Sequence, residues 1–471
     1  MSKLDRRAFL LSGAASLAGA SGCNLAETPS RQPNVFLVIG DDMAYYDAGC
    51  YGSQQARTPN IDRLAGQGMR FERAFTGTAM CAPMRQQLYT GLFPVRSGAY
   101  PNHSKSREGV RSIPHYFGAL DYRVGLWGKK HFGPPENYPF EDLGQSPEDF
   151  IDFDQVADFV SRDPEQPYFL TVCSHDSHLP YLSGDQSHFD PAEIELPPYL
   201  VDTPKTREFY AAYLAEVENL DSQVGECMRI VDESGQADDT IFIFCSEQGS
   251  AFPGGKWTCY EAGLREAWVV RWPGRVAAGV TTDAMVQNVD ALPTLIEAAG
   301  GNPRQNDFDG RSYLDVLEGR ADTHGQHAFG VHTTRGIIAG SENYPVRSVR
   351  DDRYKLIWNL NYATKFHNIV TEGEDESNYW AEWVTAAETD PHAARMVARY
   401  QQRPEYEFYD LDEDPWELDN RIGDPAHAKR VVMLRETLEA WMDQQGDRGI
   451  ETEAEALDHQ LPRRNRGREI P

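Results

Sequence analysis

The stretch Asn34-Val35-Phe36-Leu37-Val38-Ile39-Gly40-Asp41-Asp42 joins a short apolar run to a glycine and two acids. An apolar run of this length, rich in β-branched residues, predicts a buried strand. Runs of the same kind follow at residues 123–127, 168–174, 240–245 and 267–271. Helical patterns lie between them, as at residues 58–70 and 290–299. This alternation predicts an α/β fold with a large, mostly parallel sheet.

Chemistry-bearing side chains follow four of the predicted strands, at the point where each strand ends. They form the stretches 40–42 (GDD), 128–131 (GKKH), 175–178 (HDSH) and 246–249 (SEQG). Because the carboxyl ends of parallel strands meet at one edge of a sheet, we expect these stretches to share one crevice.

The expected crevice combines oxygen ligands with positive charges. Oxygen donors that suit Ca²⁺ or Mg²⁺ are offered by Asp41, Asp42, Glu247 and Gln248. Positive charge and hydrogen-bond donors are offered by Arg85, Lys129, His131, His178 and Lys256. Cations beside a carboxylate-bound metal ion make sense if an anionic group bridges them. The residues alone therefore predict a site for a sulfate or phosphate ester.

The sequence pattern changes after about residue 330. Strand-like runs at residues 353–360 and 407–411, and an amphipathic helical pattern at residues 429–445, predict a smaller α+β part with its own sheet. We therefore expect a catalytic domain at residues 33–330 and a C-terminal subdomain with a small antiparallel sheet and a helix at residues 331–471. The charged tail from residue 451 onward is expected to be poorly ordered at its end.

The 471-residue chain carries a formal net charge of −28. Such an acidic protein is not expected to bind nucleic acid through a broad surface. Most of the surface would also repel an anionic substrate, so a local cationic pocket has to bind it. The charge balance therefore favours a narrow site for one terminal anionic group.

The first 30 residues predict an export signal and a polar linker. Arg6 and Arg7 precede an apolar stretch at residues 8–20, the pattern of a twin-arginine signal for export to the periplasm. The apolar stretch is shorter than the about 20 residues of a membrane-spanning helix. Residues 20–23 (ASGC) are similar to a lipoprotein cleavage box, with alanine where leucine is usual. A free periplasmic protein and a lipid anchor on Cys23 both stay open.

The sharpest local signal is the stretch CAPMR at residues 81–85, with LYTG at residues 88–91. Here the sequence resembles the formylglycine-dependent sulfatases of the alkaline phosphatase superfamily, whose maturation motif is Cys-x-Pro-x-Arg. The resemblance covers nearly the whole chain after the signal and includes His178 and the stretches 41–42, 128–131, 256–258, 260–263, 271–274, 409–411 and 414–417. It implies an alkaline-phosphatase-like fold, in which helices sandwich the large sheet.

The resemblance also implies a nucleophile. A maturation enzyme would oxidise Cys81 to formylglycine, whose hydrated aldehyde carries two hydroxyl groups. One hydroxyl would attack sulfur, and deprotonation of the other would expel sulfate and restore the aldehyde. A serine or a thiol lacks the second hydroxyl, so its sulfated adduct would not break down.

The same resemblance implies roles for the other site residues. A divalent metal, Ca²⁺ with Mg²⁺ as the second candidate, would be held by Asp41, Asp42, Cys81, Glu247 and Gln248. Arg85 would steady the formylglycine hydroxyl, and Lys129 and His131 would flank it. Lys129, His178 and Lys256 would bind the sulfate, with His178 as the acid for the leaving group.

Two places depart from the family pattern. Met84 stands where the family usually has serine, which removes a hydroxyl near the nucleophile. Glu247 and Gln248 stand where the family usually has Asp-Asn or Asp-His. Relative to Asp-Asn, each keeps its head group and adds one methylene, so an oxygen-rich site is expected with a shifted ion.

Several stretches, partly outside the shared catalytic core, resemble the sulfamidases, which are heparan N-sulfatases. They lie at residues 110–114, 128–134, 138–140, 344–349 and 358–361. They make N-sulfoglucosamine of heparan-type chains the best single expectation for the substrate. Arg347 is then either a second contact to the anion or an arginine at the surface or a subdomain interface.

Three other functions stay open. A phosphodiester or phosphonate monoester hydrolase of the same superfamily would bind a substrate of the same tetrahedral shape. A 6-O-sulfatase would act on the sugar at another position. A catalytically silent glycan-binding protein has the Glu247-Gln248 departure as its support.

Overall fold

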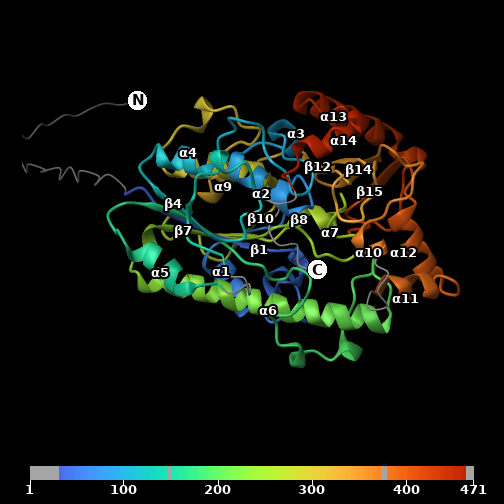
Figure 1. Ribbon diagram of the computed structural model, residues 1–471, viewed down its shortest axis with the longest axis horizontal. Coiled ribbons are helices and arrows are strands. Elements are labelled where there is room, and N and C mark those ends of the chain that lie inside the picture. Colours follow the sequence, from blue (N-terminus) through green and yellow to red (C-terminus); the bar gives the residue numbers. More distant parts are fainter. Residues whose placement is uncertain (1–30, 146–150, 373–378, 463–471) are drawn as a thin grey trace, which may run out of the picture. The chain divides into compact units, whose positions relative to one another are not determined.

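The computed structural model describes residues 31–145, 151–372 and 379–462 (Figure 1). The expected export signal, with its arginine pair and Cys23, lies outside these residues. Residues Gln32–Pro471 form one compact unit. Within the described ranges, no helix has both the length and the apolar character needed to cross a membrane.

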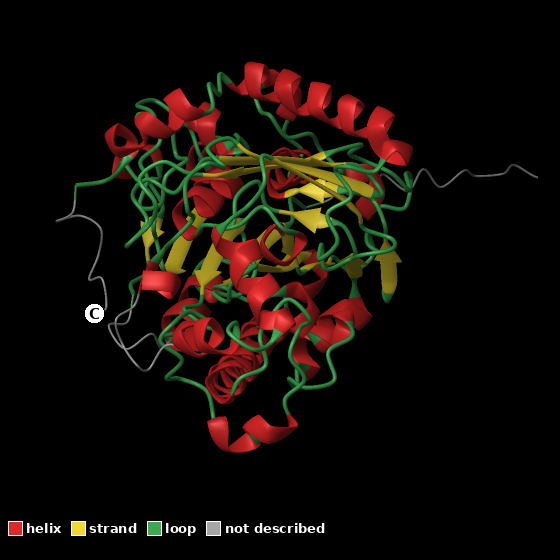
Figure 2. Cartoon of the chain, turned by 90° about the vertical axis from the view of Figure 1, so that its right-hand side faces the viewer, coloured by secondary structure: helices red, strands yellow, loops and turns green. Residues whose placement is uncertain are grey.

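A large sheet runs through the middle of this unit, with helices on both sides (Figure 2). In the described part of the chain its eight strands have the order β10-β2-β9-β7-β1-β6-β4-β5. Their bounds are β1 (Asn34–Gly40), β2 (Met69–Phe71), β4 (Arg123–Gly128), β5 (Glu141–Asp142), β6 (Tyr168–Cys173), β7 (Thr240–Ser246), β9 (Trp268–Arg271) and β10 (Val280–Thr282). Strand β9 runs antiparallel to β2 and β7, and the other pairs are parallel. The prediction of a mixed, mostly parallel sheet is confirmed.

The side chains of β1 alternate between two apolar clusters, one on each face of the sheet. Phe36 and Val38 belong to one cluster, and Val35, Leu37 and Ile39 belong to the other. The first cluster is covered by α1 (Pro59–Gln67), α5 (Phe153–Ser161) and α6 (Pro204–Glu233). The second is covered by α2 (Cys81–Thr90), α4 (Ile113–Gly118) and α8 (Ala291–Ala298). Burial on both faces explains why the strand is a continuous apolar run.

The helix predicted at residues 58–70 is shorter than expected. It ends at Gln67, and Met69 begins β2 at the far side of the sheet. Gly68 lies between them, and a Cβ atom there would stand 2.2 Å from the carbonyl oxygen of Val270 in β9. Close contact with the neighbouring strand therefore breaks a pattern that looks helical in sequence.

Two smaller sheets complete the described strands. One contains β3 (Ala74–Phe75), β8 (Arg265–Glu266) and β11 (Val286–Gln287). The other is antiparallel and contains β12 (Ala328–His332), β13 (Val346–Arg350), β14 (Tyr354–Asn359) and β15 (Tyr406–Asp410). Helix α13 (Ala428–Gln445) shares an apolar cluster with this sheet. The smaller C-terminal α+β part is confirmed, whereas a domain boundary at residue 331 stays a prediction.

The start of the charged tail is structured. Helix α14 (Ile450–Ala454) places Glu453 where its carboxylate accepts hydrogen bonds from the backbone of Thr334 and Arg335. The last nine residues, 463–471, lie outside the described part. Further helices are α3 (Pro94–Ser97), α7 (Glu261–Leu264), α9 (Leu314–Leu317), α10 (Ile369–Glu372), α11 (Tyr379–Ala386) and α12 (Pro391–Gln401).

Candidate active site

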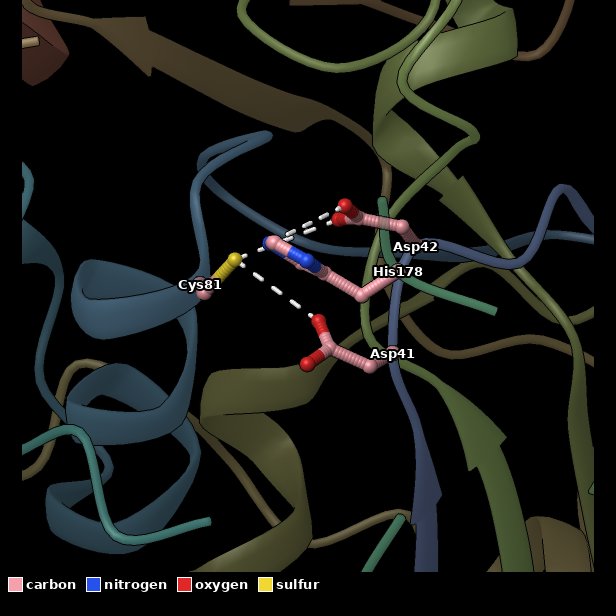
Figure 3. Close-up of side chains that lie close together, drawn as sticks. All are labelled: Asp41, Asp42, Cys81 and His178. Atoms are coloured by element: carbon pink, nitrogen blue, oxygen red, sulfur yellow. Dashed lines mark hydrogen bonds and ion pairs between the residues drawn. The ribbon is translucent and has the colours of Figure 1, made fainter. Parts of the chain in front are cut away.

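Four side chains from three separate parts of the chain meet at the carboxyl edge of the large sheet (Figure 3). Asp41 and Asp42 follow β1, Cys81 begins α2, and His178 follows β6. Their possible ligand atoms all lie within 4.8 Å of one another. The Cys81 Sγ atom lies 3.7 Å from Asp41 Oδ1 and 3.9 Å from Asp42 Oδ1. The crevice predicted from the strand ends is therefore formed, with the cysteine inside it.

Glu247 and Gln248, which follow β7, complete the oxygen-rich side of the site. Both side chains are buried. The amide Nε2 of Gln248 donates to Asp42 Oδ1 and lies 3.4 Å from Cys81 Sγ. Glu247 Oε1 accepts a hydrogen bond of 2.5 Å from Arg85 Nε. The additional methylene of each side chain thus leaves both head groups in contact with the cluster.

Two lysines neutralise the paired aspartates. Lys256 Nζ lies 2.5 Å from Asp42 Oδ2, and Lys129 Nζ forms an ion pair with Asp41 Oδ2. Burial alone would lower the pKa of Lys256, but the attraction of Asp42 and other nearby negative groups outweighs it and raises the pKa above its ordinary value. The pKa of Lys129 is raised in the same way, with Asp41 as the main opposing charge. Both lysines therefore stay positive at neutral pH.

The buried carboxylates differ in their proton affinity. Burial raises the pKa of Glu247 well above its ordinary value, even though Arg85 lies beside it. For Asp41 the same burial is outweighed by Lys129 and by a hydrogen bond with Glu247, which hold its pKa well below the ordinary value. Two acids so close together favour a bound cation.

The donor set fits a hard divalent cation. Gln248 Oε1 is buried and finds no hydrogen-bond partner among the described residues. Rotation of the amide would exchange Oε1 with Nε2 and turn the oxygen toward Asp42 and Cys81. A buried unpartnered oxygen costs about 1–3 kcal/mol, which ligation would recover. Carboxylate and amide oxygens are the ligands that Ca²⁺ and Mg²⁺ prefer.

Two histidines border the cluster. His178 Nε2 lies 3.6 Å from Asp42 Oδ2, and its side chain is 37% exposed, compared with 3% for Lys256. Burial and Lys256 lower the pKa of His178. Burial and Lys129 hold the pKa of His131 well below its ordinary value. The lysines thus oppose protonation of both rings.

Local packing explains how the motif presents Cys81. Met84 is fully buried and belongs to the apolar cluster that contains Leu37 and Ile39. It anchors α2 on the sheet, so position 84 serves packing.

The loop before Lys256 is tightly packed, because a Cβ atom on Gly255 would stand 2.3 Å from the carbonyl oxygen of Ser250. The loop can bring Lys256 to Asp42 because glycine is at position 255.

Arg347, the expected second anion contact, makes its described contacts within the C-terminal part of the chain. Its side chain is fully buried, and its guanidinium forms an ion pair with Asp447 and donates to the carbonyl oxygens of His332 and Val346. These contacts engage the guanidinium within the protein, and a role of Arg347 as a second contact to the substrate anion stays a prediction. Arg347 lies in β13 and Asp447 follows α13, so the ion pair lies within the C-terminal part and does not cross the expected boundary at residue 331.

Two residues near the site were not predicted. Asp176 lies in the loop that carries His178, and its carboxylate accepts hydrogen bonds from Asn219 and Gln223 of α6. His103 lies in a loop outside the sheet, and its Nδ1 atom is 2.9 Å from Nε2 of His131. Asp176 stands in the strand-end stretch 175–178, but no role was assigned to it, and His103 belongs to no motif. Their partners are distant in sequence, so only the fold brings them together.

Comparison with known families decides the identity of this arrangement. The family model described as Sulfatase matches residues 33–301, which contain every residue of the cluster. The chain belongs to the sulfatase family. Membership makes the protein a hydrolase acting on sulfate esters. A second model, described as N-sulphoglucosamine sulphohydrolase, C-terminal, matches residues 255–382. The resemblance seen in the Cys81 motif is confirmed.

Individual sulfatases are similar over most of their length. An ulvan-active sulfatase of Formosa agariphila is 32% identical over 427 residues, which cover 89% of this chain and 81% of that protein. The N-sulphoglucosamine sulphohydrolase of Homo sapiens is 28% identical over 464 residues, which cover 88% of this chain and 90% of that protein.

Solved structures share the fold of this sulfatase. A protein in complex with its substrate D-glucosamine-2-N,6-O-disulfate aligns with a TM-score of 0.70 at 20% identity and covers 89% of this chain and 99% of its own. The phosphonate monoester hydrolase of Agrobacterium radiobacter aligns with a TM-score of 0.70 at 19% identity, covering 89% and 97%. At this identity the likeness concerns the fold alone, and the alkaline-phosphatase-like architecture is confirmed.

Proposed function

We propose that this sulfatase hydrolyses a sulfate ester or sulfamate on a sugar of a sulfated glycan, with a formylglycine made from Cys81 as its nucleophile and Ca²⁺ as its metal. The observation that carries the proposal is the position of Cys81. Its sulfur lies within 4 Å of Asp41, Asp42 and Gln248. Two lysines, Lys256 buried and Lys129 half-buried, flank the same carboxylates, so nucleophile, metal ligands and anion-binding groups share one small space.

The best single substrate within this proposal is N-sulfoglucosamine of heparan-type chains. The match to the C-terminal model of N-sulphoglucosamine sulphohydrolase supports it, because that match, at residues 255–382, extends past residue 301, where the match to the Sulfatase model ends. The human relative of that name supports it over most of both chains. The higher identity to an ulvan-active sulfatase keeps other sulfated polysaccharides on the substrate panel.

Asp41, Asp42, Gln248 and Glu247 would hold the metal together with the modified Cys81. A divalent cation bound there polarises a sulfate oxygen and lowers the pKa of a nucleophilic hydroxyl. Mg²⁺ suits the same oxygen donors and is the second candidate. The maturation enzyme that converts Cys81 is the protein partner that this chemistry requires.

The remaining groups act on the substrate and on protons. Lys129 and Lys256 supply fixed positive charge that attracts the sulfate oxygens. Because the whole chain has a net charge of −28, such attraction is available only locally. Arg85 holds Glu247 and donates to the backbone oxygen of Lys129, so it ties the two sides of the site together. His178, the more exposed group, would protonate the leaving oxygen or nitrogen.

We further propose that the protein reaches its substrate outside the cytoplasm. The arginine pair Arg6-Arg7 and the apolar stretch that follows support export to the periplasm by the twin-arginine route. A lipid on Cys23 would hold the mature protein at the membrane surface. Mass spectrometry of the mature N-terminus from the native host distinguishes a lipidated Cys23 from a free end.

The nucleophile is tested by mass spectrometry. After co-expression with a formylglycine-generating enzyme, the tryptic peptide of residues 74–85 should lose the sulfur of Cys81 and carry an aldehyde. Replacing Cys81 with alanine should abolish sulfate release without loss of folding. An active enzyme that contains only the unmodified thiol would refute the formylglycine mechanism.

The substrate is tested with glucosamines sulfated singly at the N-, 6-O- or 3-O-position, together with ulvan and aryl phosphodiesters. Release of sulfate from the N-sulfated sugar is the expected outcome. Activity on the 6-O-sulfate without activity on the N-sulfate would make the enzyme a 6-O-sulfatase. A rate on phosphodiesters far above that on every sulfated compound would indicate a phosphoester hydrolase instead.

A further inference from the structure

His103 makes a direct contact with a histidine of the proposed site. Its Nδ1 atom lies 2.9 Å from Nε2 of His131, and the two ring centroids are 4.9 Å apart. The other ring nitrogen of His131, Nδ1, is buried and has no hydrogen-bond partner among the described residues. His103 therefore anchors one end of the His131 ring, and the opposite end is left for a bound group.

The contact has a chemical consequence for His131. A neutral imidazole carries one N–H, so its two nitrogens are one donor and one acceptor. The nitrogen of His131 that faces His103 has to complement the nitrogen it meets. The opposite ring nitrogen, the buried Nδ1 atom, then takes the other role. A partner behind a functional histidine in this way fixes both its tautomer and its orientation.

His103 is itself held in an unusual backbone conformation. Its φ angle is +54°, in the left-handed region that non-glycine residues rarely adopt. Its backbone N–H donates to Asn102 Oδ1 at 3.0 Å, and its carbonyl oxygen accepts from the backbone of Leu461 at 2.9 Å. Hydrogen bonds thus hold the backbone on both sides of the His103 Cα atom.

The C-terminal segment Gln460-Leu461, which we call the strap, connects the loops around this histidine pair. Gln460 Nε2 donates to the carbonyl oxygens of Asn102, at 2.7 Å, and Gly336, at 3.1 Å. Leu461 packs so closely on the loop after His131 that a Cβ atom on Gly133 would stand 2.7 Å from its Cδ2. The strap therefore touches the loop of His103 and the loop of His131 at once.

We propose that His103 is a positioning residue for the hydrolysis: it fixes the ring orientation and tautomer of His131, and the strap holds it in place to do so. The inference rests on the proposed function, since it assigns His131 a role in that reaction. His103 lies behind His131 and is not proposed to touch the substrate.

The test uses two substitutions that both tolerate a positive φ angle. His103→Asn keeps a side-chain hydrogen-bonding group near the position of Nδ1, and His103→Gly removes it, while both residues adopt the left-handed region readily. With sulfate release as the assay, His103→Gly should lower kcat by about 10–100-fold, the usual effect of losing such a partner. KM should stay within about 2-fold, and His103→Asn should recover most of kcat.

Matched variants separate positioning from general damage. His188→Gly removes an imidazole that bonds to Glu218 outside the site and should leave kcat unchanged. Gln460→Ala cuts the strap from Asn102 and should lower kcat less than His103→Gly does. A wild-type kcat in His103→Gly, or an equal loss in His103→Asn, would overturn the positioning role. A wild-type kcat in Gln460→Ala would remove the strap from the proposal.

A second readout does not depend on turnover. NMR of ¹⁵N-histidine-labelled, unmodified protein reports the tautomer of His131, with His131→Gln to assign its signals. One dominant tautomer is expected in the wild type and a mixture in His103→Gly; identical spectra would contradict the inference. If no compound on the panel is hydrolysed, the proposed function fails on its own, and the NMR comparison still decides whether His103 controls His131.

Discussion

Gln248 reaches Asp42 and Cys81 with a side chain one methylene longer than asparagine, and its buried Oε1 remains without a described partner. The carboxylates around it are already paired with Lys129, Lys256 and Arg85. A bound cation would therefore give the amide oxygen of Gln248 the partner that the neighbouring carboxylates already have. Its contribution to metal affinity is therefore open to direct measurement.

Replacing Gln248 with leucine should weaken Ca²⁺ binding and leave the fold intact. Removing one oxygen ligand is expected to raise the dissociation constant about 10–100-fold, which reduces the stabilisation by saturating Ca²⁺ by about 1.4–2.8 kcal/mol. Thermal unfolding with Ca²⁺ and with EDTA measures the difference. Gln248→Glu keeps an oxygen and should preserve the Ca²⁺-induced rise in Tm. An undiminished rise in Gln248→Leu would exclude the amide as a ligand.

Arg347 should affect stability and not substrate affinity. Replacing it with methionine leaves Asp447 buried without its partner, a loss that typically costs about 3–5 kcal/mol. We expect a lower free energy of unfolding in urea and an unchanged KM for the folded enzyme. Arg229→Ala removes exposed pairs with Glu226 and Glu233 on the surface of α6, so it should change the free energy of unfolding far less. A raised KM in Arg347→Met at full stability would restore the substrate contact.

At the scale of elements, α6 fixes the loop that carries His178. Its Asn219 and Gln223 donate to Asp176 ahead of the histidine. Beyond the histidine, Glu216 of the same helix accepts the backbone N–H groups of Leu182 and Ser183. One helix therefore holds the loop on both sides of the proposed acid. The helix is covered by the same apolar cluster that buries β1, so the loop is tied to the sheet.

Glu216 should make stability fall as pH rises. Burial raises its pKa to about 8, above the value of about 4.3 expected in the unfolded chain. The folded state then binds the proton more tightly, so the stabilisation is complete below pH 4.3 and is lost progressively up to pH 8. Glutamine at position 216 cannot ionise. The Tm of Glu216→Gln minus the Tm of the wild type should therefore become more positive as the pH rises from 5 to 8.5. Glu226→Gln, on the exposed side of α6, should show no such increase.

The sequence predicted the strands that build the site because each is buried on both faces and so forms an unbroken apolar run, as in β1 and β7. It also predicted Asp41, Cys81 and Lys256, since each stands beside a strand end or in a motif. It missed the strap and His103, whose bonds join residues as distant as Gln460 and Asn102. It left two roles open for Arg347, because the pairing with Asp447, 100 residues further along the chain, cannot be read from the sequence.

At the scale of the whole described unit, a buried ion network joins the catalytic part to the small sheet. Glu261 of α7 pairs with Arg350 at 2.6 Å and with Lys355 at 3.0 Å. Lys355 also lies 3.1 Å from Glu417. All four side chains are buried. This network agrees with Gln32–Pro471 being one compact unit, and it predicts that the two parts unfold together.

Lys355→Met tests this coupling. Methionine retains most of the length of the side chain but leaves Glu417 buried without its cation and Glu261 with Arg350 alone, which is expected to cost about 3–5 kcal/mol. Because the network crosses between the two parts, the variant should show one unfolding transition, at a lower urea concentration than the wild type. Fluorescence and sulfate release, measured at each urea concentration, should report the same midpoint. Arg435→Ala, which removes an exposed pair with Glu439, should shift the midpoint by less than about 0.5 kcal/mol. Two separate transitions in the wild type would show that the small sheet folds on its own and that the ion network does not couple the parts.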